Sequence, residues 1–176
     1  YIPNNATLSI AGDFRTEEAK AWIEKYFSGI PKKAEPYRPN IVEPDLGGEV
    51  RDTVYDNIQL PAVVQAYRIP AQGTEDFYAV NMLAQLLSQG QSSRLYKKLV
   101  DEEEKALFAG NFPLSMEDPG LALAFAITSM GVAPDEVETL IDTEIMKVQT
   151  ELISEDEFQK LRNQVENDFV SSNSNV

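Results

Sequence analysis

Proline in the stretch between residues 31 and 48 is the feature that most limits how this chain can fold. Its prolines and closing glycines are Pro31, Pro36, Pro39, Pro44, Gly47 and Gly48. Proline at this density excludes a helix and favours an extended, semi-rigid connection. We therefore predict a linker over residues 31–48, with the end of one packed unit before it (1–30) and most of a second unit after it (49–176).

The first region has the pattern of one strand followed by one helix. Ala6–Ile10 alternates apolar and polar side chains, which predicts a short strand. Thr16 is predicted to cap a helix whose first turn carries Glu17 and Glu18. The apolar residues of that helix recur at helical spacing on one face: Ala19, Trp22, Ile23, Tyr26 and Phe27.

The second region alternates pairs of strands with pairs of helices. The predicted strands are Glu49–Ile58, Ala62–Ile69, Leu107–Leu114 and Leu121–Met130. The predicted helices cover Glu75–Leu87, a segment capped by Ser92 or Ser93, Asp135–Glu151, and a last segment opened by a capping box at Ser154–Glu157. That last helix has no clear stop before Val176, so we expect it to fray or to continue beyond this sequence.

Strands that occur in adjacent pairs favour an antiparallel sheet over a doubly wound parallel one. The predicted fold class is therefore α+β, an antiparallel sheet with helices packed on one face.

Composition excludes several kinds of chemistry. The 176 residues include no His and no Cys. A Ser-His or Cys-His nucleophile pair is therefore excluded, as is a zinc site built on imidazole or thiolate. A metal site in this chain would need oxygen ligands alone, which suit Ca²⁺ or Mg²⁺ better than zinc.

Charge and hydropathy narrow the range of partners. The formal net charge of −14 argues against nucleic acid or an anionic membrane surface, because both reward clusters of Lys and Arg. No apolar run approaches the roughly 20 residues that cross a bilayer. The sequence begins with Tyr1 rather than Met, so we expect a piece of a longer protein. The absence of Cys is compatible with a bacterial periplasm or cell envelope and also with the cytoplasm, so the sequence assigns no cellular compartment.

Two clusters are candidates for binding. Ser93 and Arg94 follow Gly90 at the start of a predicted helix, where backbone N–H groups and a guanidinium can hold an anion or a substrate. The ordinary alternative is that the serine caps the helix and Arg94 ties the loop to a carbonyl or carboxylate group. The acidic run Asp101–Glu104 points around a helix axis and is interpreted as solvated surface.

Several segments together resemble the pitrilysin/insulinase zinc peptidases, whose zinc motif is H-x-x-E-H. The opening Tyr1–Phe14 is similar to that family's Y-x-P-x-N strand followed by Gly-Asp, and Lys25–Pro31 is similar to its K-Y-F-G-x-(I/L)-P pattern. Leu86–Leu99 is similar to its L-L-G-x-G-x-S-S-R-L-(F/Y)-x-x-L helix junction, and Glu104–Phe108 matches its E-K-x-L-A stretch loosely. The similar segments follow the family's order across nearly the whole chain.

The resemblance implies the half-domain fold of the mitochondrial processing peptidase, in which paired α+β half-domains close around a peptide. It implies zinc in the parent protein, bound by a catalytic half-domain that this chain lacks. The expected partners are that half-domain, in the same chain or in a partner subunit, and a peptide substrate. Members of the family can hold the substrate backbone with an Arg and a Tyr. The corresponding residues 121–142 contain neither, so no catalytic residue is assigned here.

Three functional interpretations follow. In the first, the chain is a non-catalytic region of a zinc endopeptidase of bacterial type and helps to enclose a peptide. In the second, it belongs to a catalytically dead relative that acts as a structural or partner subunit. In the third, it is a protein-binding module unrelated to proteolysis.

Overall fold

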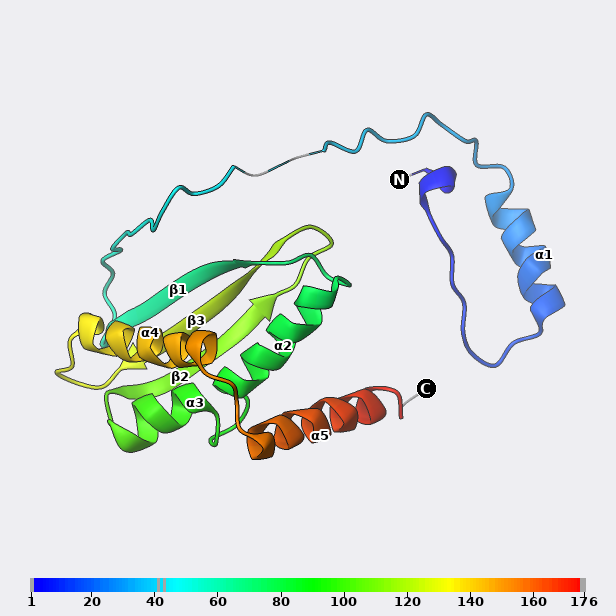
Figure 1. Ribbon diagram of the computed structural model, residues 1–176. Helices are drawn as coiled ribbons and strands as arrows, with labels where there is room; N and C mark the ends of the chain where they lie inside the picture. Colours follow the sequence, from blue (N-terminus) through cyan, green and yellow to red (C-terminus); the bar gives the residue numbers. More distant parts are fainter. Residues whose placement is uncertain (1, 41, 43, 175–176) are drawn as a thin grey trace. The chain divides into compact units, whose positions relative to one another are not determined.

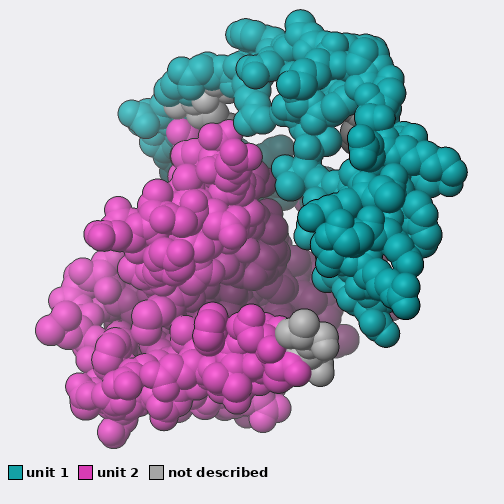
Figure 2. All heavy atoms as spheres, turned by 90° about the vertical axis from the view of Figure 1, so that its right-hand side faces the viewer, with its two compact units in different colours: residues 1–54 teal, residues 55–176 magenta. Residues whose placement is uncertain are grey.

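A computed structural model of the chain describes residues 2–40, 42 and 44–174. These residues divide into two units, residues 1–54 and residues 55–176, which Figure 2 colours separately. Tyr1 of the quoted opening motif and the last two residues of the predicted tail lie outside the described residues.

The first unit contains a short 3₁₀ turn, η1 (Pro3–Asn5), and one helix, α1 (Thr16–Phe27). The Asn4 side chain exchanges two hydrogen bonds with the backbone of Lys33, at 3.2 and 3.4 Å. No described residue of α1 is buried, and the Trp22 side chain is 61% exposed. The apolar face predicted for this helix is therefore largely exposed, and only Ala19 and Ile23 on it are partly covered.

Two details of the first region were predicted wrongly. Ala6–Ile10 is not a strand, because a strand is held by hydrogen bonds to a neighbouring strand and the described sheet includes no pairing of these residues. Thr16 is the first residue of α1, not its cap. The cap position belongs to Arg15, which makes no capping hydrogen bond through its side chain.

The second unit is built on a three-stranded antiparallel sheet of β1 (Ala62–Ile69), β2 (Ala106–Leu114) and β3 (Gly120–Thr128). The strand order is β1-β3-β2, so β3 lies in the centre (Figure 1). Ala62 pairs with Ile127 on one side, and Leu114 pairs with Leu121 on the other. One irregularity in the register follows Ala106 in β2. The predicted bounds of β1 are confirmed, and those of β2 and β3 differ by one or two residues.

The predicted strand over residues 49–58 is absent, and this stretch runs without regular structure into β1. Its alternating pattern is suited to a strand, and Val50, Val54 and Tyr55 are largely exposed. The pattern describes side chains that fit a sheet face, but a strand also needs a neighbour to pair with. The described sheet gives residues 49–58 no such pairing.

The helices of the second unit are α2 (Glu75–Ser88), α3 (Arg94–Tyr96), the π-helix η2 (Lys97–Glu102), α4 (Pro134–Thr150) and α5 (Glu155–Ser172). Thr74 caps α2 by accepting a hydrogen bond from the Phe77 N–H at 3.3 Å. The predicted capping box of α5 is confirmed, because Ser154 and Glu157 bond each other's backbone N–H groups. The segment predicted after Ser93 is helical, but most of it has π-helical spacing.

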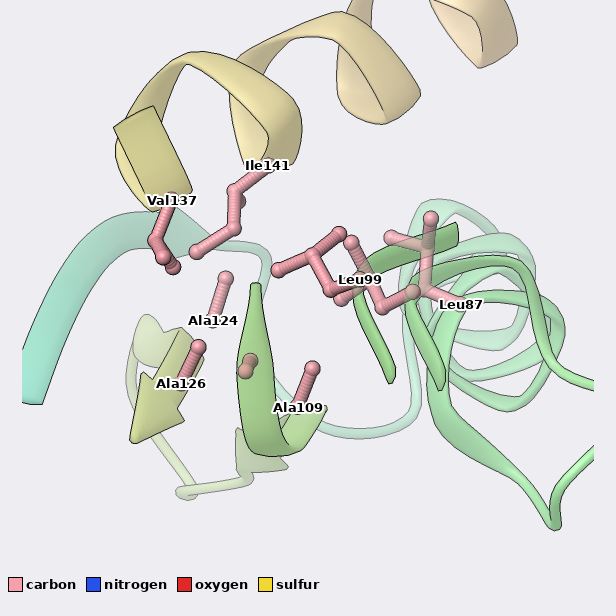
Figure 3. Close-up of a cluster of buried hydrophobic side chains, with 9 residues drawn as sticks. Leu87, Leu99, Ala109, Ala124, Ala126, Val137 and Ile141 are labelled. Atoms are coloured by element: carbon pink, nitrogen blue, oxygen red, sulfur yellow. The ribbon is translucent and has the colours of Figure 1, made fainter. Parts of the chain in front are cut away.

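The core lies between the sheet and these helices (Figure 3). Ala122, Ala124 and Ala126 of β3 are buried at every second position, as expected when one face of a strand is covered. Larger side chains from the helices fill the space above them: Leu87, Leu95, Leu99, Val137 and Ile141. Small residues on the sheet therefore interdigitate with large residues on the helices. The predicted fold class, an antiparallel sheet with helices packed on one face, is confirmed.

The opposite face of the sheet is apolar and partly exposed. Its side chains include Val64, Phe108, Phe112, Leu114, Leu121, Phe125 and Ile127. Phe125 lies at the middle of this face, with ring centroids 5.2 Å from Phe108 and 5.6 Å from Phe112. Strands that are apolar on both faces are typical of sheets covered on both sides, so this face is suited to a further layer.

Candidate functional site

The predicted candidates Ser93 and Arg94 lie at the junction of α2, α3 and α5. Gly90 has a φ of 78°, which lets the chain turn sharply after α2. The Ser93 N–H donates to the Gly90 carbonyl at 3.1 Å, and the Ser93 carbonyl accepts from the Lys97 N–H at 2.9 Å. These backbone bonds shape the turn, and the Ser93 side chain is only 2% exposed, with a buried hydroxyl that has no hydrogen-bond partner among the described residues.

Arg94 forms a bidentate ion pair with Glu157. Its Nε donates to one carboxylate oxygen at 2.9 Å and its Nη2 donates to the other at 3.0 Å. The two residues are 63 positions apart and join α3 to the first turn of α5. Parallel N–H···O bonds of this kind fix both distance and orientation. The pair therefore fastens α5 to the rest of the second unit.

The electrostatics of Glu157 agree with this role. Hydrogen bonds from the Arg94 guanidinium lower the pKa of the Glu157 carboxyl group from its usual 4.5 to about 2. Desolvation acts in the opposite direction, and hydrogen bonds from Ser154 add to the lowering. The carboxylate is therefore ionised throughout the physiological range, and it accepts two of the five N–H donors of the Arg94 guanidinium. A substrate role for Ser93 and Arg94 stays a prediction.

The acidic run at Asp101–Glu104 lies at the end of η2. Two of its carboxylates are paired with Lys98, at 3.3 Å for Glu102 and 2.8 Å for Glu103. Within the described part of the chain, no group of three or more His, Cys, Asp or Glu residues could hold a metal ion. Among those same residues no helix has the length and apolar character needed to cross a membrane.

Residues 121–142, which contain no Arg or Tyr, form most of β3 and the first half of α4. Ala124, Ala126, Val137 and Ile141 from this stretch are buried in the core. The stretch therefore serves to join the central strand to the helical layer.

The fold is that of an α+β half-domain, its sequence contains no His or Cys, and its described residues form no metal-binding group. Residues 1–165 match the family described as the peptidase M16 inactive domain, and the chain belongs to this family. It is accordingly a non-catalytic region of a zinc peptidase family, and the resemblance to that family seen in the sequence is confirmed.

The relatives agree with this assignment. The chain is 28% identical over 176 residues to the zinc protease PqqE of Helicobacter pylori, an alignment that covers 98% of this chain and 39% of that protein. The crystal structure of a protease from Helicobacter pylori is similar with a TM-score of 0.81 and 25% identity, over 91% of this chain and 39% of that one. The inactive peptidase domain of a Bordetella parapertussis protein is similar with a TM-score of 0.60 and 25% identity, over 66% of this chain and 63% of that one. The chain thus spans about two fifths of the length of the two Helicobacter relatives.

Proposed function

We propose that this chain is the non-catalytic region of a longer zinc metalloendopeptidase, in which it helps to enclose a peptide substrate. The match of residues 1–165 to an inactive peptidase domain carries the proposal. The name of the Helicobacter relative as a zinc protease supports it, and so does the greater length of that relative. The apolar outer face of the sheet supports it as well, because a missing layer of the longer protein would cover that face.

The proposal includes an organisation of the chain. Residues 1–30 are the end of a preceding half-domain, residues 31–48 are the linker, and residues 49–176 are most of the non-catalytic half-domain. The exposed apolar side chains of α1 support this division, since a helix with an apolar stripe normally buries it against a core.

Zinc belongs to the proposed parent and not to this chain. The residues present do not fit the ion, because the chain has no His or Cys and its described carboxylates form no three-ligand group. No catalytic step passes through this region. Its proposed contribution is to position the peptide and to restrict water around it.

The test is a comparison of peptide cleavage by the longer protein and by this chain. An H-x-x-E-H motif in the longer coding sequence, with cleavage that a chelator abolishes and zinc restores, would support the proposal. The isolated 176-residue chain should cleave nothing under the same conditions. A longer coding sequence without H-x-x-E-H would contradict it.

One observation favours a second candidate, a catalytically dead partner subunit. Residues 121–142 lack the Arg and Tyr that the resemblance implies for holding a substrate backbone. This candidate predicts that the longer protein is inactive alone and gains activity in a stable complex with a separate zinc-containing subunit. Membership of the peptidase family leaves no support for the third interpretation, an unrelated binding module.

A further inference from the structure

The contact between α5 and the rest of the second unit is largely polar. Among the residues of α5, only Leu161 is buried, and only Glu157 and Gln164 are half-buried. Their spacing of four and then three positions places these residues on one stripe of the helix. Leu161 and Glu157 border a small cavity together with Gln85 and Leu86 of α2, so this stripe meets α2. A docked helix normally buries an apolar stripe, whereas this stripe has one apolar member.

The apolar side of α5 is mostly left uncovered. Phe158, Val165 and Phe169 are 42%, 38% and 70% exposed. Their spacing of seven and then four positions places them together on a second stripe, beside the first. The stability of a docked helix comes mainly from burial of its apolar side chains. Apart from Leu161, the apolar residues of α5 therefore contribute little to holding it in place.

The junction of α5 with α2 and α3 also contains buried polar atoms without partners. Among the described residues, the buried side-chain oxygens that accept or donate no hydrogen bond belong to Gln85, Gln89, Ser93 and Gln164. These residues lie in α2, in the turn that follows α2, and in α5. A buried oxygen that loses water without gaining a partner costs free energy, and it regains water when the contact opens. These atoms therefore weaken the docked position of α5.

The Arg94–Glu157 pair is the main fastening of α5. Its two N–H···O bonds, at 2.9 and 3.0 Å, are charge-assisted and parallel. Two exposed hydrogen bonds add to it: Lys160 to Ser92 at 2.6 Å and Gln89 to Asp168 at 3.5 Å. Exposed polar pairs contribute little, because water competes for both partners. The docked position thus depends on one ion pair and one buried leucine.

Residues 151–153, between α4 and α5, are suited to act as a hinge. They have no regular secondary structure, and Leu152 is fully exposed. At the end of α4 the Glu151 N–H donates to the Lys147 carbonyl at 2.8 Å, and α5 begins with its own capping box. Because each helix end is satisfied locally, a rotation in residues 151–153 leaves both ends intact.

We propose that α5 is a hinged helix, fastened by the Arg94–Glu157 pair, that swings away from α2 as a unit on residues 151–153 while the sheet and α4 stay folded. The open form exposes Leu161 together with Leu86 of α2, and both side chains are buried when α5 is docked. The movement is a property of the second unit alone and does not depend on the proposed function.

The test is native-state hydrogen exchange of the 176-residue chain, followed by NMR at neutral pH in low concentrations of urea. Amides in the middle of α5 should exchange at least about 100-fold faster than those of β3 and α4, because a detached helix of this length is marginal in water. Their rates should depend weakly on urea, since the swing of one helix exposes little surface. They should also share one opening free energy, whereas fraying gives a gradient along the helix.

Two variants change the fastening in opposite directions. Glu157→Gln removes the charge of the pair and should speed the exchange of α5 about tenfold. Glu166→Gln makes the same change in an exposed pair on the same helix, and as the control it should alter the exchange little. Gln85→Met removes a buried oxygen without a partner and keeps the length of the side chain. It should slow the exchange of α5 several-fold, a gain that a misfolded variant cannot imitate.

Exchange of α5 with the rate and urea dependence of β3 would overturn the proposal, and so would a gradient of rates from the C-terminal end of the helix. Equal effects of Glu157→Gln and Glu166→Gln would show that the ion pair is not the fastening. Faster exchange of α5 in Gln85→Met would show that the unpaired oxygens do not weaken its docking.

Discussion

At the scale of single residues, Gly120 shows how closely the strands approach. It begins β3 with the carbonyl group of Leu114 from β2 directly against its Cα. A Cβ atom built at Gly120 would overlap that carbonyl oxygen, and backbone cannot turn aside as a side chain can. Gly110 offers a contrast, since a Cβ there would meet only the rings of Phe108 and Phe125, at 3.4 and 3.5 Å.

We therefore predict that Gly120→Ala destabilises the second unit by about 1–3 kcal/mol, the usual cost of overpacking. The matched substitution Gly110→Ala should cost less than about 1 kcal/mol, because the two rings can shift slightly. Urea unfolding followed by circular dichroism measures both. Equal losses for the two variants would show that the contact at Leu114 is not what excludes a side chain.

The ion pair of Arg94 and Glu157 makes a second prediction at this scale. The pKa of Glu157 is lowered to about 2 by hydrogen bonds from Arg94, so its contribution to stability is complete above about pH 4.5 and is lost as the pH falls toward 2. The Glu157 side chain is 33% exposed, so solvent screens the ion pair. We therefore expect the pair to contribute about 1–2 kcal/mol to the free energy of unfolding, less than the full pKa shift would give.

Glu157→Gln removes this charge but keeps a residue that completes a capping box. The variant should be less stable than the wild type by about 1–2 kcal/mol at pH 7, and the difference should shrink between pH 4.5 and 2. Glu166→Gln, at an exposed pair with Arg162, is the control and should change stability little at either pH. A difference for Glu157→Gln that is constant with pH would contradict the account.

At the scale of elements, α4 holds the helical layer to the sheet through a few buried side chains. Ile141 is fully buried against the alanines of β3, whereas Met146 on the same helix is 61% exposed. Ile141→Ala should cost about 2–5 kcal/mol, because it removes apolar contacts and leaves a cavity. Met146→Ala should cost less than about 0.5 kcal/mol. Thermal unfolding of both variants tests this, and similar losses would mean that α4 is not anchored at Ile141.

The sequence predicts the helices and their caps better than it predicts which strands pair with one another. The helices α2, α4 and α5 and the strand β1 follow from periodicity and caps, since Thr74, Ser154 and Glu157 act within a few residues of their own helix. The stretches 6–10 and 49–58 have strand-like patterns but no partner, and a pattern does not supply a neighbour.

The candidate sites depend on contacts across long stretches of sequence. Arg94 and Glu157 are 63 residues apart, and Gln89 and Asp168 are 79 apart. Sequence reasoning identified Arg94 and foresaw a carboxylate as one alternative partner, but nothing in a single sequence marks Glu157 as that partner.

At the scale of the whole molecule, the two units should differ in protection. No described residue of α1 is buried, and the segment before it has no strand partner. Hydrogen exchange of the isolated chain in dilute solution should therefore be fast in residues 6–27 and slow in β3 and α4. Strong protection of residues 6–27 in a dilute monomer would contradict the proposed division of the chain.

We propose that this region supports peptide cleavage by the longer protein without performing it. The most direct measurement is zinc-dependent cleavage by the catalytic part of the longer protein, assayed without and then with the 176-residue chain added. We predict negligible cleavage by this chain alone, weak cleavage by the catalytic part alone, and a strong increase when the two are combined. Full activity of the catalytic part alone, unchanged by adding this chain, would contradict the claim.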